Sequence, residues 1–153
     1  MTAVNGLLTA IELATRQRDD AGQAMAQVVR RHAQACQQLE QLESYAADTS
    51  ARWSVTSQSS ATPQIVGHYY QFMARLEQTI EMQQGAIAEV QRQRESARQI
   101  LLDAEVRLAG LARLLEKRRS ELARVHSQRE QRQSDELASQ MHRRRLLAND
   151  NRE

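Results

Sequence analysis

Apolar residues recur at alternating spacings of three and four along two long segments, and this heptad repeat restricts the chain to helices that pack through a narrow seam. In a heptad written abcdefg, the a and d positions face the partner helix. Counted from Val4 to Ala46, eleven of thirteen a and d positions are apolar. Counted from Met73 to Val125, thirteen of sixteen are apolar. Neither segment contains proline, so each predicts one long helix.

Residues 47–67 separate the two segments, are rich in Ser and Thr, and hold the only proline, Pro63. Ser and Thr offer the backbone local hydrogen bonds, and proline lacks a backbone donor, so a helix is expected to stop here. So short a connection brings the second helix back against the first. The predicted fold is all-α: a two-helix antiparallel coiled coil (helical hairpin) that forms a single domain over residues 1–153. Helix one is expected at about 3–46, the connector at about 47–67 and a longer helix two at about 68–147. A frayed end follows to 153.

The second helix is predicted to continue beyond the first. Antiparallel packing that places Leu42 beside Met73 also places Val4 near Leu111, after which helix two would continue alone for roughly 50 Å at about 1.5 Å per residue. Arg, Gln, Glu, Leu and Ala are good helix formers, so this extension is expected to stay helical. Its core positions are polar and have no apolar partner in the chain: Arg129, Arg132 and Glu136.

The composition excludes most catalytic sites. Aromatic residues make up only 3% of the chain, which fits a thin seam and leaves no pocket that excludes water. No nucleophile, base and orienting group lie together, so we expect no enzymatic activity and no cofactor. His32 and Cys36 are four residues apart and could supply two metal ligands, but no second pair completes a tetrahedral site. Both are therefore interpreted as structural.

Basic residues concentrate towards the C-terminus. Residues 1–88 carry 6 basic and 8 acidic side chains, and residues 89–153 carry 15 and 11. The stretch SQREQRQSDELASQMHRRR, residues 127–145, is named the tail here and has three interpretations: a nucleic-acid arm, a solvated helix face, or a helix that another protein binds. A nucleic-acid arm is disfavoured because the tail lacks aromatic residues and is interrupted by acids. These acids are Glu130, Asp135 and Glu136.

The chain is expected to act in the cytoplasm. A single cysteine, Cys36, cannot form an internal disulfide, which fits a reducing compartment. The first residues lack the basic and apolar regions of a signal peptide, and no segment approaches the roughly 20 apolar residues of a membrane span.

Four stretches resemble the flagellar type III export component FliJ, a family of small antiparallel coiled coils. In order and nearly in spacing they are LATRQRDDA (13–21), QLESY (41–45), YYQFMARLEQTIEMQQ (69–84) and QREQRQSDELASQMHRR (128–144). The connector differs from the family pattern, since Thr49 stands where some members have a second tyrosine.

The resemblance implies a cytosolic, non-enzymatic protein similar to the central stalk of a rotary ATPase. Such a protein would associate with the export ATPase ring, contact the cytosolic domain of the export gate and escort export chaperones. It would meet the inner membrane only through the export apparatus and would bind no nucleic acid. The alternatives are the equivalent stalk of a virulence-type injectisome and a generic coiled-coil adaptor.

The resemblance also implies two sets of site residues. The first would dock on the export gate and is named the docking surface here: Gln38, Leu42, Tyr45, Phe72, Leu76, Thr79 and Gln83. In another interpretation its two aromatic residues only pack against each other at the hairpin end. The second set lies in the tail and would contact the ATPase ring: Arg129, Arg132, Asp135, Glu136, Arg143, Arg144 and Arg145.

Overall fold

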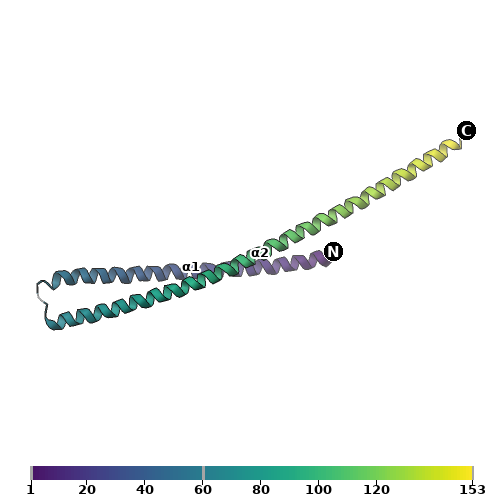
Figure 1. Ribbon diagram of the computed structural model, residues 1–153. Helices are drawn as coiled ribbons and strands as arrows, with labels where there is room; N and C mark the ends of the chain where they lie inside the picture. Colours follow the sequence, from purple (N-terminus) through teal and green to yellow (C-terminus); the bar gives the residue numbers. More distant parts are fainter. Residues whose placement is uncertain (1, 60, 153) are drawn as a thin grey trace. The chain divides into compact units, whose positions relative to one another are not determined.

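The structure, a computed structural model, describes residues 2–59 and 61–152 and contains two helices. Helix α1 spans Thr2–Thr56 and helix α2 spans Pro63–Asp150 (Figure 1). The described residues contain no strand. The predicted all-α hairpin with a longer second helix is therefore confirmed.

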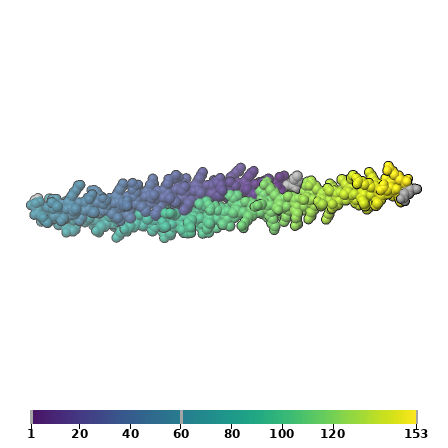
Figure 2. Space-filling view, turned by 90° about the horizontal axis from the view of Figure 1, so that it is seen from above, coloured from purple at the N-terminus to yellow at the C-terminus, as the bar shows by residue number. Residues whose placement is uncertain are grey.

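The chain comprises two compact units, each containing part of both helices. One unit is Arg16–Val106, and the other combines Met1–Thr15 with Arg107–Glu153. Within the first unit α1 and α2 run antiparallel. Trp53 stacks on Tyr69 with ring centroids 4.3 Å apart, and farther from the connector Gln83 of α2 reaches back to Ala35 of α1. The space-filling view in Figure 2 shows the two helices in contact along this unit.

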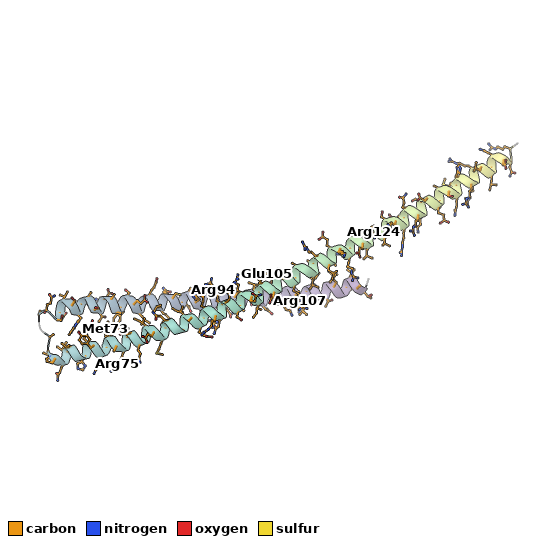
Figure 3. The ribbon with its side chains drawn as sticks, viewed as in Figure 1. Met73, Arg75, Arg94, Glu105, Arg107 and Arg124 are labelled. Atoms are coloured by element: carbon orange, nitrogen blue, oxygen red, sulfur yellow. The ribbon has the colours of Figure 1, made fainter. Side chains whose placement is uncertain are left out.

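Burial follows the heptad repeat in both helices. The buried side chains are Ala14, Ala21, Val28 and Leu76, and all four occupy a or d positions. Between Val66 and Leu115, every α2 residue that is not exposed also occupies an a or d position. Figure 3 shows this alternation near the connector, with Met73 facing α1 and Arg75 facing outward. The seam is one layer of side chains thick, because among the described residues each helix packs only against the other.

The helix boundaries differ from those expected at about 46 and 68. Helix α1 continues to Thr56, α2 begins at Pro63 and α2 ends at Asp150, so the link between them is much shorter than residues 47–67. The heptad continues past Ala46 to Trp53, and the stack of this indole on α2 keeps the Ser/Thr-rich stretch helical. Local side-chain hydrogen bonds form where α1 ends. For example, the Ser57 Oγ donates to the carbonyl of Ser54 at 3.4 Å.

A helix does end within residues 47–67, at Thr56, but Pro63 begins the next helix and does not end the first. It occupies the first helical position, where the missing N–H has no intrahelical partner in any case. Thr62 caps this end, because its Oγ1 accepts a hydrogen bond from the backbone N–H of Ile65 at 3.4 Å. The carbonyl of Thr62 accepts the N–H of Val66 at 3.1 Å, which closes the first helical turn.

Replacing Thr62 with alanine is expected to lower the free energy of unfolding by about 1 kcal/mol, because one backbone donor of α2 loses its acceptor. Urea unfolding followed by circular dichroism measures the change. Thr56→Ala is the control, since the Thr56 hydroxyl donates to a carbonyl that is already inside α1. Equal destabilisation by both substitutions would show that Thr62 does not act as a cap.

The expected register is wrong by one heptad. Counting heptads from the Trp53 and Tyr69 stack places Leu42 level with Ile80, not with Met73. In the other unit Val4 lines a groove with residues between Arg118 and Val125, well past Leu111. The extension of α2 is correspondingly shorter, about 40 Å from Val125 to Asp150 at about 1.5 Å per residue.

Candidate functional site

Two aromatic residues of the docking surface meet across the seam. The rings of Tyr45 on α1 and Phe72 on α2 lie edge to face, with centroids 6.0 Å apart and an interplanar angle of 81°. This contact stabilises the hairpin, as in the interpretation that gives both residues a packing role. Both remain accessible, since Tyr45 is 56% exposed and Phe72 40% exposed. The pair can therefore pack within the hairpin and also contact a partner.

Two amide side chains of the docking surface form a polar bridge between the helices. Gln83 occupies a d position, where its Nε2 donates to the carbonyl of Ala35 at 2.9 Å and to Oε1 of Gln38 at 3.2 Å. A polar residue in a coiled-coil core favours one register when its hydrogen bonds are satisfied. Gln83 therefore helps to hold the observed register as well as lying on the docking surface.

The remaining docking-surface residues differ in accessibility. Leu76 is only 8% exposed and belongs to the seam. Leu42 is half-buried at another d position. Thr79 is exposed, and its Oγ1 donates to the carbonyl of Arg75 at 2.9 Å. The seven residues thus occupy one region of a single unit, where the leucines support the surface and the aromatic and polar residues form it.

Three aromatic residues near the connector, to which the sequence assigns no site role, pack together. Trp53 stacks on Tyr69 at an interplanar angle of 9°, and the ring of Tyr70 lies against Tyr69 with centroids 5.4 Å apart. The signal was present in the heptads, because Trp53 lies one heptad after Ala46 and Tyr69 one heptad before Leu76. The seam therefore extends to the connector.

The tail is a helix exposed on all sides. Every described residue from Glu116 onward is exposed, and Figures 1 and 2 show no part of residues 2–15 beside the yellow C-terminal end of α2. Among the described residues, the tail side chains make only local contacts, such as Gln131 Nε2 to Asp135 Oδ1 at 3.3 Å. The structure therefore presents the seven tail site residues along one helix and does not gather them into a cluster.

A small groove marks the end of the seam beside the start of α1. It has a volume of 250 Å³ and is lined by Ala3, Val4, Arg118, Glu121, Leu122 and Val125. Leu122 is 53% exposed and Val125 41% exposed, although both continue the heptad. The apolar part of the seam ends at this groove, and all tail residues follow it.

The polar residues at core positions have different surroundings. Arg18 pairs with its neighbour Asp19, its Nη2 lying 2.8 Å from Oδ1. Arg94 makes no ion pair with the described residues, and Glu95 pairs with Arg98 at 3.4 Å. In the observed register Arg94 lies level with Val28, so the two core arginines do not face each other.

The structure gives little support for other kinds of site. The Cys36 Sγ lies 3.9 Å from both ring nitrogens of His32, a weak contact along one helix. The described residues contain no group of three or more side chains that could hold a metal ion. None of the helices, over the residues described, is long and apolar enough to span a bilayer.

Comparison with known proteins finds a match to a protein family. The family model described as "Flagellar FliJ protein" matches residues 5–147, nearly the whole chain. No curated protein and no solved structure matches the chain. The matched range includes the docking surface, the tail and most of both helices that carry them. The chain therefore belongs to the flagellar FliJ family.

Proposed function

We propose that this protein couples the ATPase ring of the flagellar export apparatus to the export gate and escorts export chaperones. Membership of the FliJ family makes it a stalk-like protein of flagellar type III export, in a family of non-enzymatic export components. In this proposal it acts without catalysis on the cytoplasmic side of the inner membrane and reaches the membrane only through the apparatus. The docking surface contacts the cytosolic domain of the gate, and the tail contacts the ring.

One observation supports this proposal most strongly: the paired and accessible aromatic rings of Tyr45 and Phe72. Exposed aromatic residues are enriched at binding hot spots, and a chain with 3% aromatic residues has few to place there. Because each ring is held by the other, little side-chain freedom remains to be lost on binding. These are the properties of a preformed protein contact.

The tail supports the second contact of the proposal. Its helix is exposed and carries both signs of charge, with Arg129 and Arg132 near Asp135 and Glu136 in the sequence. Mixed charge suits ion pairs with a protein surface better than a phosphate backbone, which would repel the two acids. A helix that finds no neighbour among the described residues is also free to enter the opening of a ring.

The gate contact is tested by the double substitution Tyr45→Ala and Phe72→Ala. We expect the affinity of the doubly substituted protein for the purified gate cytosolic domain to be at least about thirtyfold lower than that of the wild type. Truncating one interface anchor costs about 2 kcal/mol or more. Isothermal titration calorimetry with the full chain measures the affinity. Circular dichroism should show that helicity is retained, because both residues stand at g positions and the substitutions leave every a and d residue of the seam in place.

Met82→Ala is the matched control, since Met82 lies on α2 outside the seam and is 75% exposed. It should leave gate affinity unchanged. Unchanged gate binding by the double variant would remove Tyr45 and Phe72 from the interface and would leave them the packing role alone.

A further inference from the structure

The part of the hairpin nearest the connector is almost free of charge. Between Thr49 and Ala74 the only formally charged side chain is Arg52, whereas 26% of the whole chain is charged. The same stretch contains most of the aromatic residues. A neutral aromatic surface with one arginine differs from the solvated helix faces found elsewhere in this protein.

This uncharged region continues the docking surface along one side of the seam. Tyr45 and Phe72 both stand at g positions, immediately before an a position, and their contact shows that the g positions of the two helices meet on this side. One heptad farther from the connector the g positions are Gln38 and Thr79, which also belong to the docking surface. One heptad nearer the connector they are Arg52 on α1 and Ile65 on α2.

The extension is exposed and rests on a rigid base. Ile65 is 47% exposed, and Arg52 is exposed and makes no ion pair with the described residues. Next to them in the heptad lie Trp53 and Tyr69, whose stacked rings fix the spacing of the two helices. The N-cap of α2 at Thr62 fixes the backbone that leads to Ile65. Such preorganisation lowers the entropy lost on binding.

We propose that Arg52 and Ile65, supported by the Trp53 and Tyr69 stack, extend the docking surface to the connector. The extension inserts into a cleft on the partner protein. This cleft has apolar walls and a carboxylate at its far end. Ile65 enters the apolar part, and the Arg52 guanidinium pairs with the carboxylate. This inference rests on the proposed function, because the cleft belongs to the same gate domain that binds Tyr45 and Phe72.

The chemistry of this region favours a protein over a lipid surface. Peripheral binding to anionic membranes depends on several Lys or Arg side chains beside the apolar ones, and this region offers one. Arginine, by contrast, is among the residues most enriched at protein hot spots and binds a carboxylate through two parallel hydrogen bonds.

The opposite side of the seam provides a matched control. Tyr70 lies at an e position, is 64% exposed, and belongs to the same uncharged region. Its neighbours on that side include Glu43 and Glu77, which stand at e positions one heptad farther from the connector. A partner that uses the g side does not need Tyr70.

The test measures binding of full-length variants to the purified gate cytosolic domain by calorimetry. Arg52→Glu and Ile65→Ser are each expected to weaken binding at least about tenfold, as expected of hot-spot residues, while Tyr70→Ser changes it less than about twofold. Arg52→Lys should recover part of the affinity, because it restores the charge without the planar fork. Arg52 is exposed at a helix surface, so Arg52→Glu tests the proposal even if Ile65→Ser alters folding.

The outcomes separate this inference from the proposed function. If the wild-type chain binds the gate and Tyr45→Ala with Phe72→Ala weakens binding while Arg52→Glu does not, the extension is overturned and the docking surface stands. If the wild-type chain does not bind the gate, both are overturned. If Arg52→Glu instead abolishes binding to vesicles of anionic phospholipid and leaves gate binding intact, the region contacts lipid and the protein cleft is excluded.

Discussion

Deletion of the chain from Ser127 onward is expected to abolish stimulation of the export ATPase while leaving the helical hairpin folded. The last α2 residue that is not exposed is Leu115, and the groove beside the start of α1 ends at Val125. Over the residues that the structure describes, the deletion therefore removes no seam contact. It does remove all seven tail residues proposed to face the ring, so ring association should be lost with little change in melting temperature.

Salt should weaken the association of the tail with the ATPase ring in the full-length protein. The tail charges are exposed, and exposed charges are screened over about 8 to 10 Å at physiological ionic strength. Stimulation of the ATPase should therefore decline as salt increases, and the double substitution Arg129→Glu and Arg132→Glu should reduce stimulation without shortening the helix. Equal stimulation by the truncated and full-length proteins would show that the tail is a solvated extension.

The substitution Leu76→Asp is expected to be the most destabilising single change in the docking surface. Leu76 is 8% exposed within the seam, so the substitution removes apolar burial and forces a carboxylate against the other helix. We expect a loss of about 3 kcal/mol or more in the free energy of unfolding. Chemical denaturation followed by circular dichroism measures it.

Met82→Asp is the control for this prediction. It introduces the same carboxylate six residues along α2, at a side chain that is 75% exposed. Its stability should stay within about 0.5 kcal/mol of the wild type, as is usual for exposed positions. If the two substitutions had the same effect on stability, Leu76 would not be a seam residue. It would then have to be counted among the exposed contacts of the docking surface.

The heptad pattern predicted the seam because period and burial are directly linked in a two-helix packing. Core positions such as Val28 and Leu76 are buried as the spacing requires. The register could not be predicted in the same way, since shifting one helix by seven residues again places a and d positions together. Specific pairs decide between such registers, and here they are Trp53 with Tyr69 and Gln83 with Ala35.

The connector is shorter than its composition predicts, because the heptad periodicity continues into the Ser/Thr-rich stretch. Ser and Thr weaken a helix by tenths of a kcal/mol per residue, whereas burying one Trp contributes more than several such residues cost. Trp53 occupied a core position in the sequence, which was enough to extend α1. Pro63 suggests a break in the helix, but proline is also favoured at the first position of a helix, which is where it stands.

That the docking surface binds the gate stays a prediction. Resemblance to the FliJ family selected seven residues, and the structure brings Tyr45 to Phe72 and Gln38 to Gln83. The resemblance alone does not separate seam residues from surface residues, whereas the heptad spacing already places Leu76 at a buried d position. The structure says less about the tail than about the docking surface. The tail helix has no neighbour among the described residues, so no contact within the protein indicates what it binds.

The central claim is that the gate contact and the ring contact use different parts of this chain. The most direct test uses one preparation of the protein that ends at His126. It measures both the affinity for the gate cytosolic domain and the stimulation of the ATPase. Because distant sites contribute independently, its affinity for the gate cytosolic domain should stay within about twofold of the full-length value. Its stimulation of the ATPase should be lost. A parallel loss of gate affinity and ATPase stimulation would contradict the claim that two separate surfaces act.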